Sequence, residues 1–253
     1  MQIVGYEAGT TDAPAGLLLA ENGSVRREEL ERESVLRYDL HDRHCAGEVL
    51  DDRHLSCDRS AAPYCDRHET TWPCAVCRGD CAMPLETCHE EHVVYLAAFE
   101  PRTFKVGVTR TWRLRDRLLE QGAARGVRLR TVRNGRLARQ IEADIATDLT
   151  DRVSFGTKID GLAASLDEAA WEHLLSKYDP SERYHFEYGL ELSHRPIEAT
   201  MATGRVLGTR GRILVLERDA TAYAVDLRKL VGFEYTIGTD EGNRQVSLGT
   251  YGQ

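Results

Sequence analysis

The sequence has no long hydrophobic run and few aromatic residues, and these absences limit what it can encode. Its longest apolar stretch, Val93–Phe99, has seven residues, whereas a helix that spans a bilayer needs about 20. We therefore expect no membrane partner. The first residues also lack a basic segment followed by an apolar one, so no secretory signal is expected. These absences predict a cytoplasmic protein.

Lysine is scarce as well. Only four of the 33 basic residues are Lys, so Arg, which matches phosphate with two parallel hydrogen bonds, supplies most positive charge. Residues 101–140 contain 12 of the 33 basic residues but only 2 of the 41 acidic ones. A salt-adapted, GC-rich source would explain the Arg bias, but not this clustering. A basic segment in a chain of net charge −8 predicts focused binding of an anion.

Cysteine is absent from most of the chain, because all seven fall between Cys45 and Cys88. An odd number in a cytoplasmic protein disfavours disulfides and favours metal ligation. The surrounding residues 41–91 have almost no hydrophobic periodicity, so this region is predicted to fold around metal. Thiolate and imidazole ligands suit zinc.

The ligand spacing predicts two Zn²⁺ ions, each with four protein ligands. One set has four thiolates: Cys74, Cys77, Cys81 and Cys88. The other set combines three thiolates with an imidazole: Cys45, Cys57, Cys65 and His68. Nearby histidines remain alternatives, namely His41, His44 and His54 for the second set and His89 and His92 for the first. Closed four-ligand sites leave no position for water, so both ions are predicted to be structural.

Residues 92–150 read as a small α/β module. The apolar run at 93–99 is typical of a buried strand, and FKVGVT forms a second strand after a short turn. A helix follows from Thr111, as N-cap, to about Gly122. A third strand, VRLRTVR, precedes a second helix, in which Glu142 lies beside an apolar stripe.

This order of segments resembles the GIY-YIG nuclease module, a small antiparallel sheet with helices. VVY at 93–95 and KVG at 105–107 resemble its two signature strands. The whole chain also resembles an uncharacterised family of prokaryotic zinc-binding proteins. Members carry a cysteine cluster, then H-x-VYLA, KVGVTR and QGA motifs, then a small β-rich tail. Here the motifs begin at His92, Lys105 and Gln121.

The nuclease resemblance implies a site that cuts DNA or RNA. Tyr95 would help to deprotonate an attacking water, and Arg117 would bind the scissile phosphate. Glu142 would hold a Mg²⁺ or Mn²⁺ ion that polarises the phosphate. Lys105 departs from the pattern, since it replaces the second signature tyrosine and would act as a base only if its pKa were lowered. Further candidates for phosphate contact are Arg110, Arg113 and Arg115.

The remaining segments supply the predicted scaffold. Asn22–Gly23 indicates a hairpin turn, and Ser165 is a candidate N-cap for a later helix. The Gly-rich strands near the C-terminus predict a small β-barrel-like region, or strands that join the N-terminal ones in one sheet. The predicted class is α+β, in five regions: 1–40 β-hairpin, 41–91 zinc-binding, 92–150 GIY-YIG-like, 151–180 helical connector and 181–253 β-rich.

Together these features predict a zinc-binding, nucleic-acid-binding protein, with divalent-metal-dependent phosphodiesterase or endonuclease activity as the leading hypothesis. One alternative is a binder that keeps the fold without turnover. Another is a scaffold that uses its zinc knuckles for protein contacts. Binding to phosphates releases counterions, so the first two hypotheses predict a steep salt dependence that the scaffold does not.

Overall fold

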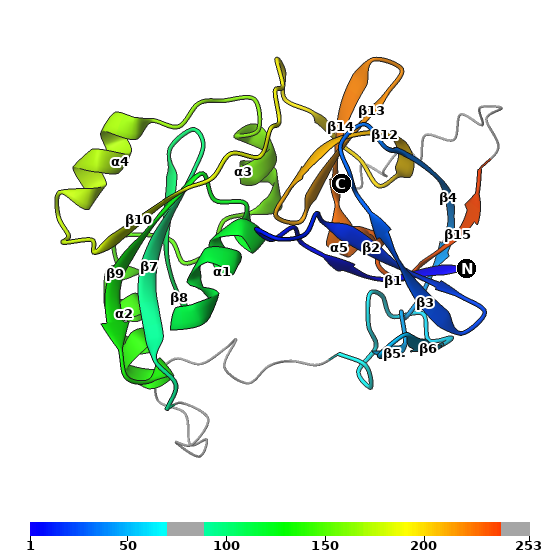
Figure 1. Ribbon diagram of the computed structural model, residues 1–253, viewed down its shortest axis with the longest axis horizontal. Helices are drawn as coiled ribbons and strands as arrows, with labels where there is room; N and C mark the ends of the chain where they lie inside the picture. Colours follow the sequence, from blue (N-terminus) through cyan, green and yellow to red (C-terminus); the bar gives the residue numbers. More distant parts are fainter. Residues whose placement is uncertain (70–88, 239–253) are drawn as a thin grey trace, which may run out of the picture.

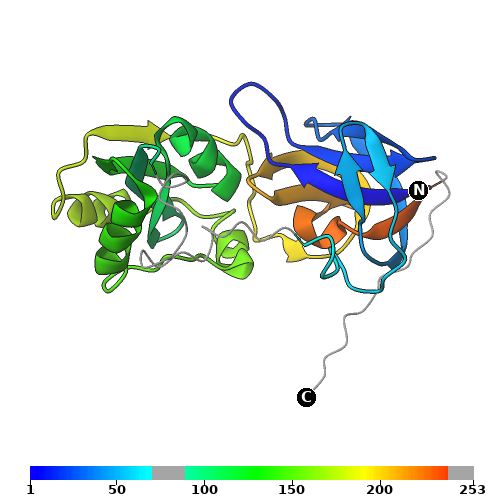
Figure 2. The same ribbon diagram turned by 90° about the horizontal axis from the view of Figure 1, so that it is seen from below.

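The protein has two lobes in the computed structural model, which describes residues 1–69 and 89–238 (Figure 1). We call residues 1–69 with 187–238 the sheet lobe, and residues 89–186 the α/β lobe. The chain begins in the sheet lobe, crosses to the α/β lobe and then returns (Figure 2). The α/β lobe is therefore inserted between two halves of the sheet lobe.

The sheet lobe contains an eleven-stranded sheet and one short helix, α5. Its N-terminal strands are β1 (Gln2–Glu7), β2 (Gly16–Glu21), β3 (Ser24–Glu29), β4 (Val35–Arg43), β5 (Glu48–Leu50) and β6 (Arg53–Leu55). Its C-terminal elements are β11 (Ile197–Glu198), β12 (Ala202–Arg210), β13 (Ile213–Arg218), β14 (Thr221–Asp226), α5 (Leu227–Leu230) and β15 (Phe233–Ile237). The strand order is β11-β14-β13-β12-β4-β15-β1-β2-β3-β6-β5.

The two ends of the chain complete each other's sheet. Strand β4 pairs with both β12 and β15, and β15 also pairs with β1. The Asn22–Gly23 turn between β2 and β3 is confirmed, with φ angles of 50° and 80°. Because strands from the two ends of the chain pair with one another, neither end has to form a barrel by itself.

One expectation about this lobe was wrong. The strands of residues 181–253 form no separate barrel, because in the described part of the chain they are shared between two open sheets. β10 (Glu182–His185) pairs with β9 in the other lobe. The zinc-binding region 41–91 also contributes regular structure, since β4 extends to Arg43 and β5 and β6 add to the sheet edge.

The α/β lobe has a four-stranded sheet in the order β10-β9-β7-β8. The other strands are β7 (His92–Phe99), β8 (Thr103–Arg110) and β9 (Arg125–Val132). The helices are α1 (Leu114–Gln121), α2 (Gly135–Ile145), α3 (Phe155–Asp160) and α4 (Glu168–Leu175), and a 3₁₀ turn at Thr111–Arg113 precedes α1. The expected order of hairpin, helix, strand and helix is confirmed.

Strand β7 is buried on both faces, as its apolar run predicts. Val94, Leu96 and Ala98 pack in one core with residues of α2 and α4. Tyr95 and Phe99 pack on the opposite face with Leu114 and Leu118 of α1 and with Phe186. The lobe therefore has a layer of helices on each side of one sheet, and α1 lies on the face that carries Tyr95.

The sequence predicted only some of the helix caps and helix ends correctly. α1 ends at Gly122, which has a φ of 73°, as expected. Thr111 is not the N-cap, because it lies inside the 3₁₀ turn. Asp167, rather than Ser165, caps α4 by accepting a hydrogen bond from the Ala170 N–H. Helix α3 was missed, since FGTKID is too short to show a period.

The lobes meet where the β12–β13 turn packs against the C-terminal end of α1. Arg210 is 8% exposed, donates to the Gly122 carbonyl at 2.8 Å and forms an ion pair with Glu100. A Cβ added to Gly211 would lie 2.6 Å from the Glu120 carbonyl oxygen, so only glycine fits this approach. The sheet lobe thereby fixes the end of the helix that carries Arg117.

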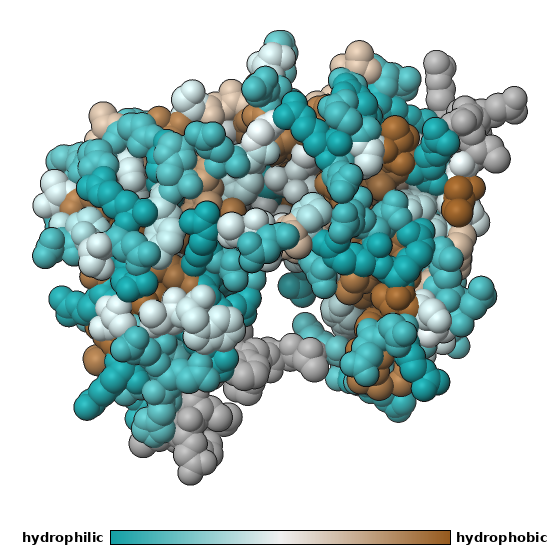
Figure 3. All heavy atoms as spheres, in the orientation of Figure 1, coloured by the Kyte–Doolittle hydropathy of each residue, from teal (hydrophilic) through white to brown (hydrophobic). Residues whose placement is uncertain are grey.

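The outside of the molecule is mostly hydrophilic on the face shown in Figure 3, in keeping with 29% charged residues. Within the residues that the structure describes, no helix has the length and apolarity needed to cross a bilayer.

Candidate functional site

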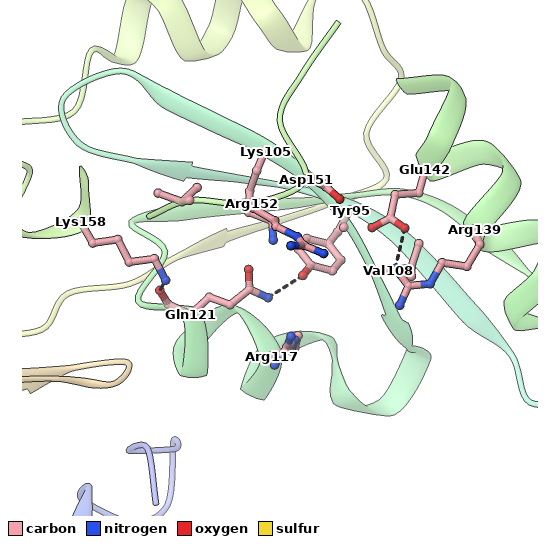
Figure 4. Close-up of a pocket in the computed structure, with 12 residues that line it drawn as sticks. Tyr95, Lys105, Val108, Arg117, Gln121, Arg139, Glu142, Asp151, Arg152 and Lys158 are labelled. Carbon is pink, nitrogen blue, oxygen red and sulfur yellow. Dashed lines mark hydrogen bonds and ion pairs between the residues drawn. The ribbon is translucent and has the colours of Figure 1, made fainter. Parts of the chain in front are cut away.

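The predicted catalytic side chains surround one hollow of about 390 Å³ at the β8 edge of the smaller sheet. Its lining includes Tyr95 from β7, Lys105 and Gly107 from β8, Arg117 and Gln121 from α1, Arg139 and Glu142 from α2, and Asp151, Arg152 and Lys158 beyond α2. Figure 4 shows Lys158 and Glu142 at opposite ends, with Tyr95 and Lys105 between them. The hollow therefore has an acidic end and a basic end.

Tyr95 lies at the base of the hollow and is 1% exposed. Its ring covers Gly107, the residue opposite it in the β7–β8 pair, and a Cβ on Gly107 would lie 2.5 Å from the hydroxyl oxygen. Gln121 donates to that hydroxyl at 2.6 Å. Burial raises the pKa of Tyr95, while the Gln121 hydrogen bond and the Arg117 charge oppose the rise. The phenol is therefore protonated at neutral pH.

Lys105 projects from β8 at the register position opposite Ala97. In the described part of the chain its ammonium makes no hydrogen bond or ion pair. Burial and the charge of Arg117 lower the pKa of Lys105 to about 8, against the opposing charges of Glu142 and Asp151. Near neutral pH a larger fraction of this lysine is therefore neutral than of an ordinary exposed lysine.

Arg117 reaches the hollow from α1, and its side chain is 48% exposed. Glu120 bonds to Arg117 at 3.1 Å and to Arg113 at 2.5 Å. This shared carboxylate holds the Arg117 guanidinium at the rim while leaving part of it open to a ligand. An exposed pair of this kind contributes little to stability, so Arg117 is available for binding.

Glu142 is only 9% exposed although it is a carboxylate on a helix. Arg139, one turn earlier on α2, donates to it at 2.7 Å. Asp151 lines the same hollow and is held near β8 because the Val106 N–H donates to the Thr150 carbonyl at 3.0 Å. Two carboxylates with a nearby guanidinium form the acidic end of the hollow.

The three further phosphate candidates lie outside the lining of this hollow. Arg110 pairs with Glu90 at 2.9 Å. Arg113 is bound to Glu120. Arg115 donates to Thr11 of the other lobe at 3.0 Å. Clustering in sequence therefore did not identify the arginines of the hollow, because successive residues of a helix point in different directions.

A second cluster lies in the sheet lobe, where Cys45, Cys57, Cys65 and His68 meet. Their ligand atoms all lie within 4.8 Å of one another. The Cys45 and Cys65 sulfurs lie 3.3 and 3.4 Å from His68 Nδ1, and Cys57 and Cys65 sulfurs are 4.0 Å apart. Sulfurs bound to one zinc ion at about 2.3 Å are about 3.8 Å apart. The group therefore fits a tetrahedral ion such as zinc.

The surroundings of this cluster suit thiolates. The backbone N–H groups of Gly47 and Cys65 donate to the Cys45 sulfur at 3.4 and 3.3 Å. Burial acts to raise the pKa of Cys65, but hydrogen bonds, that from the Arg67 backbone foremost, lower it to about 6. Burial raises the pKa of Cys45. A bound cation would favour the thiolate form of both.

The alternative ligands do not join this cluster. His44 contacts the Cys57 carbonyl and Glu234. His54 contacts the Ala46 carbonyl at 2.9 Å, and His41 contacts Thr236 at 2.8 Å. The other expected set, Cys74, Cys77, Cys81 and Cys88, lies outside the described residues. Of its two alternatives, His92 contacts the Glu90 carbonyl at 2.6 Å.

Sequence reasoning gave no role to several lining residues. Gln121 belongs to the QGA motif, and nothing local in the sequence explains why that motif is there. Asp151 and Arg139 gave no signal, because their positions depend on how α2 and the following segment pack beside β8. The parallel bridge between Lys105 and Thr150 that brings Asp151 into place is a tertiary contact.

One comparison with known proteins gave a match. A family model described as "Protein of unknown function (DUF2797)" matches residues 63–235, which is more than half of the chain. The matched part includes the whole hollow and two of the four clustered metal-ligand candidates, Cys65 and His68. No curated protein and no solved structure matches the chain.

Proposed function

We propose that this chain, which belongs to the family of unknown function DUF2797, binds nucleic acid and cleaves it. In this proposal the hollow holds a phosphodiester, a divalent cation acts at Glu142, and zinc stabilises the sheet lobe. The resemblance of the α/β lobe to the GIY-YIG nuclease module supports the proposal. Substrate, reaction and cations are inferred from the chemistry of the side chains.

The observation that carries the proposal is the gathering of Tyr95, Lys105, Arg117 and Glu142 around one hollow. They come from β7, β8, α1 and α2, so their convergence is a property of the fold and not of one segment. Lys105 has no anionic partner bonded to it within the described chain. A concave site in which a lysine lacks a bonded carboxylate favours a ligand that carries negative charge.

Phosphate binding follows from the donors available. The Arg117 guanidinium and the Tyr95 hydroxyl both point into the hollow and donate hydrogen bonds to an anion. Because burial keeps Tyr95 protonated, the phenol acts here as a donor that orients the phosphate or the attacking water. This donor role differs from the part in deprotonating water that the nuclease resemblance implies for Tyr95.

The acidic end suits a divalent cation. Mg²⁺ and Mn²⁺ prefer carboxylate oxygens and are commonly held by one or two of them together with substrate phosphate. Glu142 and Asp151 would hold the ion. When bound, it would supply positive charge to the phosphate and the leaving oxygen.

Lys105 completes the chemistry. The water oxygen bonds to phosphorus as the bond between phosphorus and the leaving oxygen breaks. The neutral Lys105 amine takes the proton that the water loses, and a pKa of about 8 makes this form accessible near neutral pH. The lysine thus replaces the second tyrosine of the nuclease pattern as a proton acceptor.

A binder without turnover is the second candidate. The observation that favours it is the Arg139–Glu142 ion pair of 2.7 Å, which already neutralises the carboxylate that would hold the cation. In this reading Lys105 stays protonated and contacts phosphate. Both candidate functions bind the same ligand. In the nuclease Glu142 would leave Arg139 and bind a metal ion, whereas in the binder the ion pair with Arg139 would stay in place.

The test uses end-labelled single-stranded and duplex DNA and RNA, incubated with the full chain and Mg²⁺ or Mn²⁺. We expect cleavage by the wild type and a loss of about 100-fold or more in the Glu142→Gln and Lys105→Gln variants. Glu172→Gln is the matched control, since Glu172 is in a surface ion pair with Arg183. Circular dichroism checks folding.

The outcomes separate the candidates. Equal cleavage by wild type and Glu142→Gln would contradict the assigned site. Binding without cleavage, unaffected by the cation, would select the non-catalytic binder. Absence of binding to every nucleic acid would contradict both.

A further inference from the structure

The basic end of the hollow contains a partly buried lysine for which the cleavage chemistry has no use. Lys158 projects from α3 and lines the hollow. Its Nζ donates to the Gln121 carbonyl at 2.7 Å and lies 5.1 Å from the centre of the Phe99 ring. An ammonium has three hydrogens to donate, so the hydrogen bond to the Gln121 carbonyl leaves further hydrogens of Lys158 available to a ligand.

Lys158 has no carboxylate partner within the described residues. The surrounding cations are better matched, because Arg210 pairs with Glu100 and Arg212 with Asp226. Asp160, two residues along the same helix, pairs with Arg195 at 2.6 Å. A partly buried ammonium that lies among other cations without a carboxylate is unfavourable for the fold alone. It becomes favourable when an anion binds beside it.

A neighbouring group also lacks a partner. The Gln121 side-chain oxygen Oε1 is buried and accepts no hydrogen bond in the described structure, while its amide nitrogen is occupied by Tyr95. Buried acceptors of this kind are usually satisfied by a ligand or water. An ammonium with free donors and an acceptor without a partner at the same end of the hollow together indicate a binding position for an anion that brings a bound water molecule with it.

We propose that the Lys158 end of the hollow is a second phosphate subsite, which binds the phosphate next to the one held at Arg117. The inference rests on the proposed function and specifies its ligand as a strand segment with two neighbouring phosphates. Lys158 then determines specificity and takes no part in bond breaking. Burial and the charge of Arg212 lower the pKa of Lys158 to about 7, and a bound phosphate would restore the proton.

The position of the subsite follows from Figure 4. Lys158 lies at the end of the hollow away from Glu142, with Tyr95 and Lys105 between the two ends. A strand that places its scissile phosphate near Arg117 and Glu142 therefore extends its next phosphate toward Lys158. A small ester with one phosphate would fill only one of the two positions.

The test compares three thymidine dinucleotides by titration calorimetry with the full chain at pH 6.5, without added divalent cation. One carries only its internal phosphate, and the other two carry an extra phosphate at the 5′ or the 3′ end. We expect one of the doubly phosphorylated ligands to bind the wild type about tenfold more tightly than the singly phosphorylated one, the gain of one charge-assisted contact. Lys158→Gln should reduce this ratio to about twofold or less.

Matched variants make the result specific. Lys158→Arg keeps the charge and should keep the tenfold ratio, and Lys177→Gln, on the surface, should leave it unchanged. The singly phosphorylated ligand should bind Lys158→Gln and wild type within about twofold of each other. Thermal unfolding of each variant checks that the fold is retained.

Each outcome is decisive. A ratio that Lys158→Gln leaves intact, or equal affinity of the wild type for all three ligands, overturns the subsite while the proposed function stands. A purely structural role for Lys158, as a cap on α1, would lower the melting temperature without changing the ratio, and also overturns it. If no dinucleotide binds the wild type and longer strands do not bind either, the proposed function itself fails.

Discussion

At the scale of single residues, the hollow is distinguished by what its charged groups lack. Most arginines of the protein have a carboxylate within reach, as Arg128 has Glu182 and Arg205 has Glu217. Lys105 and Lys158 form no ion pair in the described chain, and burial lowers the pKa of both. Perturbed lysines in a concave site are typical of function rather than of stability.

The pKa of Lys105 leads to a prediction with a definite sign. A lysine is charged below its pKa, so with a pKa of about 8 its contact with phosphate weakens as pH rises through 8. We expect wild-type affinity for an oligonucleotide, without added divalent cation, to fall about tenfold between pH 7 and pH 9.5. The cleavage rate should rise over the same interval, because the neutral amine is the base. Lys105→Gln should abolish the rise in cleavage rate and keep only the part of the fall in affinity that comes from Lys158, whose pKa is lowered to about 7. Anisotropy and rate against pH measure both, and a cleavage rate that still rises with pH in this variant would assign the base to another group.

A resemblance of motifs predicted Tyr95, Lys105, Arg117 and Glu142 as site residues, and all four line the hollow. Spacing predicted the four candidate metal ligands of the sheet lobe, and their ligand atoms lie together. The sequence could not locate Asp151 or Arg139, whose places depend on tertiary contacts beside β8. It also predicted phosphate contacts for Arg110, Arg113 and Arg115, which lie outside the lining of the hollow. Net charge along the chain does not tell which side chains face a hollow.

At the scale of elements, strand β8 is shaped by the tyrosine opposite it. Gly107 leaves room for the Tyr95 ring, and a Cβ there would lie 2.6 Å from its Cζ atom. The glycine of the KVG motif therefore has a packing reason, which the sequence alone did not show.

Gly107→Ala is therefore expected to displace Tyr95. Overpacking of a filled core costs about 1–3 kcal/mol, so urea unfolding should show a loss of that size together with reduced nucleic-acid affinity. Gly156→Ala is the matched control, since the nearest atom to its added Cβ is Ser154 Oγ at 3.9 Å. Unchanged stability and affinity in Gly107→Ala would mean that the ring is not fixed as described.

The segment between β4 and Glu69 carries the four candidate metal ligands. We expect Cys45→Ser to lower the zinc content by one ion per chain and the melting temperature by about 5–10 °C, for a loss of about 2–3 kcal/mol. His41→Gln should change neither, because His41 lies outside the ligand cluster. Elemental analysis and calorimetry provide the measurements, and two ions in the wild type would match the expectation of a second set. Full zinc content in Cys45→Ser would contradict the ligand assignment.

At the scale of the whole molecule, the α/β lobe is carried by a sheet built from both ends of the chain. The sequence predicted strands at each end and allowed for their union, but it gave no means to choose between a union and a barrel. Strand patterns record which side of a strand is buried, whereas pairing between β4 and β12 joins residues more than 160 positions apart. Such register appears only in the folded structure.

The contact between lobes should affect both stability and binding. Arg210→Met leaves the largely buried Glu100 without its partner, and the loss should approach the cost of about 3–5 kcal/mol for breaking a fully buried pair. It also removes the donor to Gly122, so α1 and Arg117 should shift and affinity should fall. Arg195→Met, in a surface pair with Asp160, should cost about 1 kcal/mol or less. Urea unfolding measures both, and equal losses would show that the Arg210 pair is not buried in solution.

The most direct measurement is the binding of a labelled single-stranded oligonucleotide at pH 7 over a range of salt concentrations. We expect the affinity of the wild type to fall steeply as the salt concentration rises. Arg117→Gln should weaken binding and lower the slope of log K against log salt by about one. Arg183→Gln, a surface arginine paired with Glu172, should behave like the wild type. Binding that is absent, insensitive to salt, or identical in Arg117→Gln and wild type would contradict a phosphate-binding hollow.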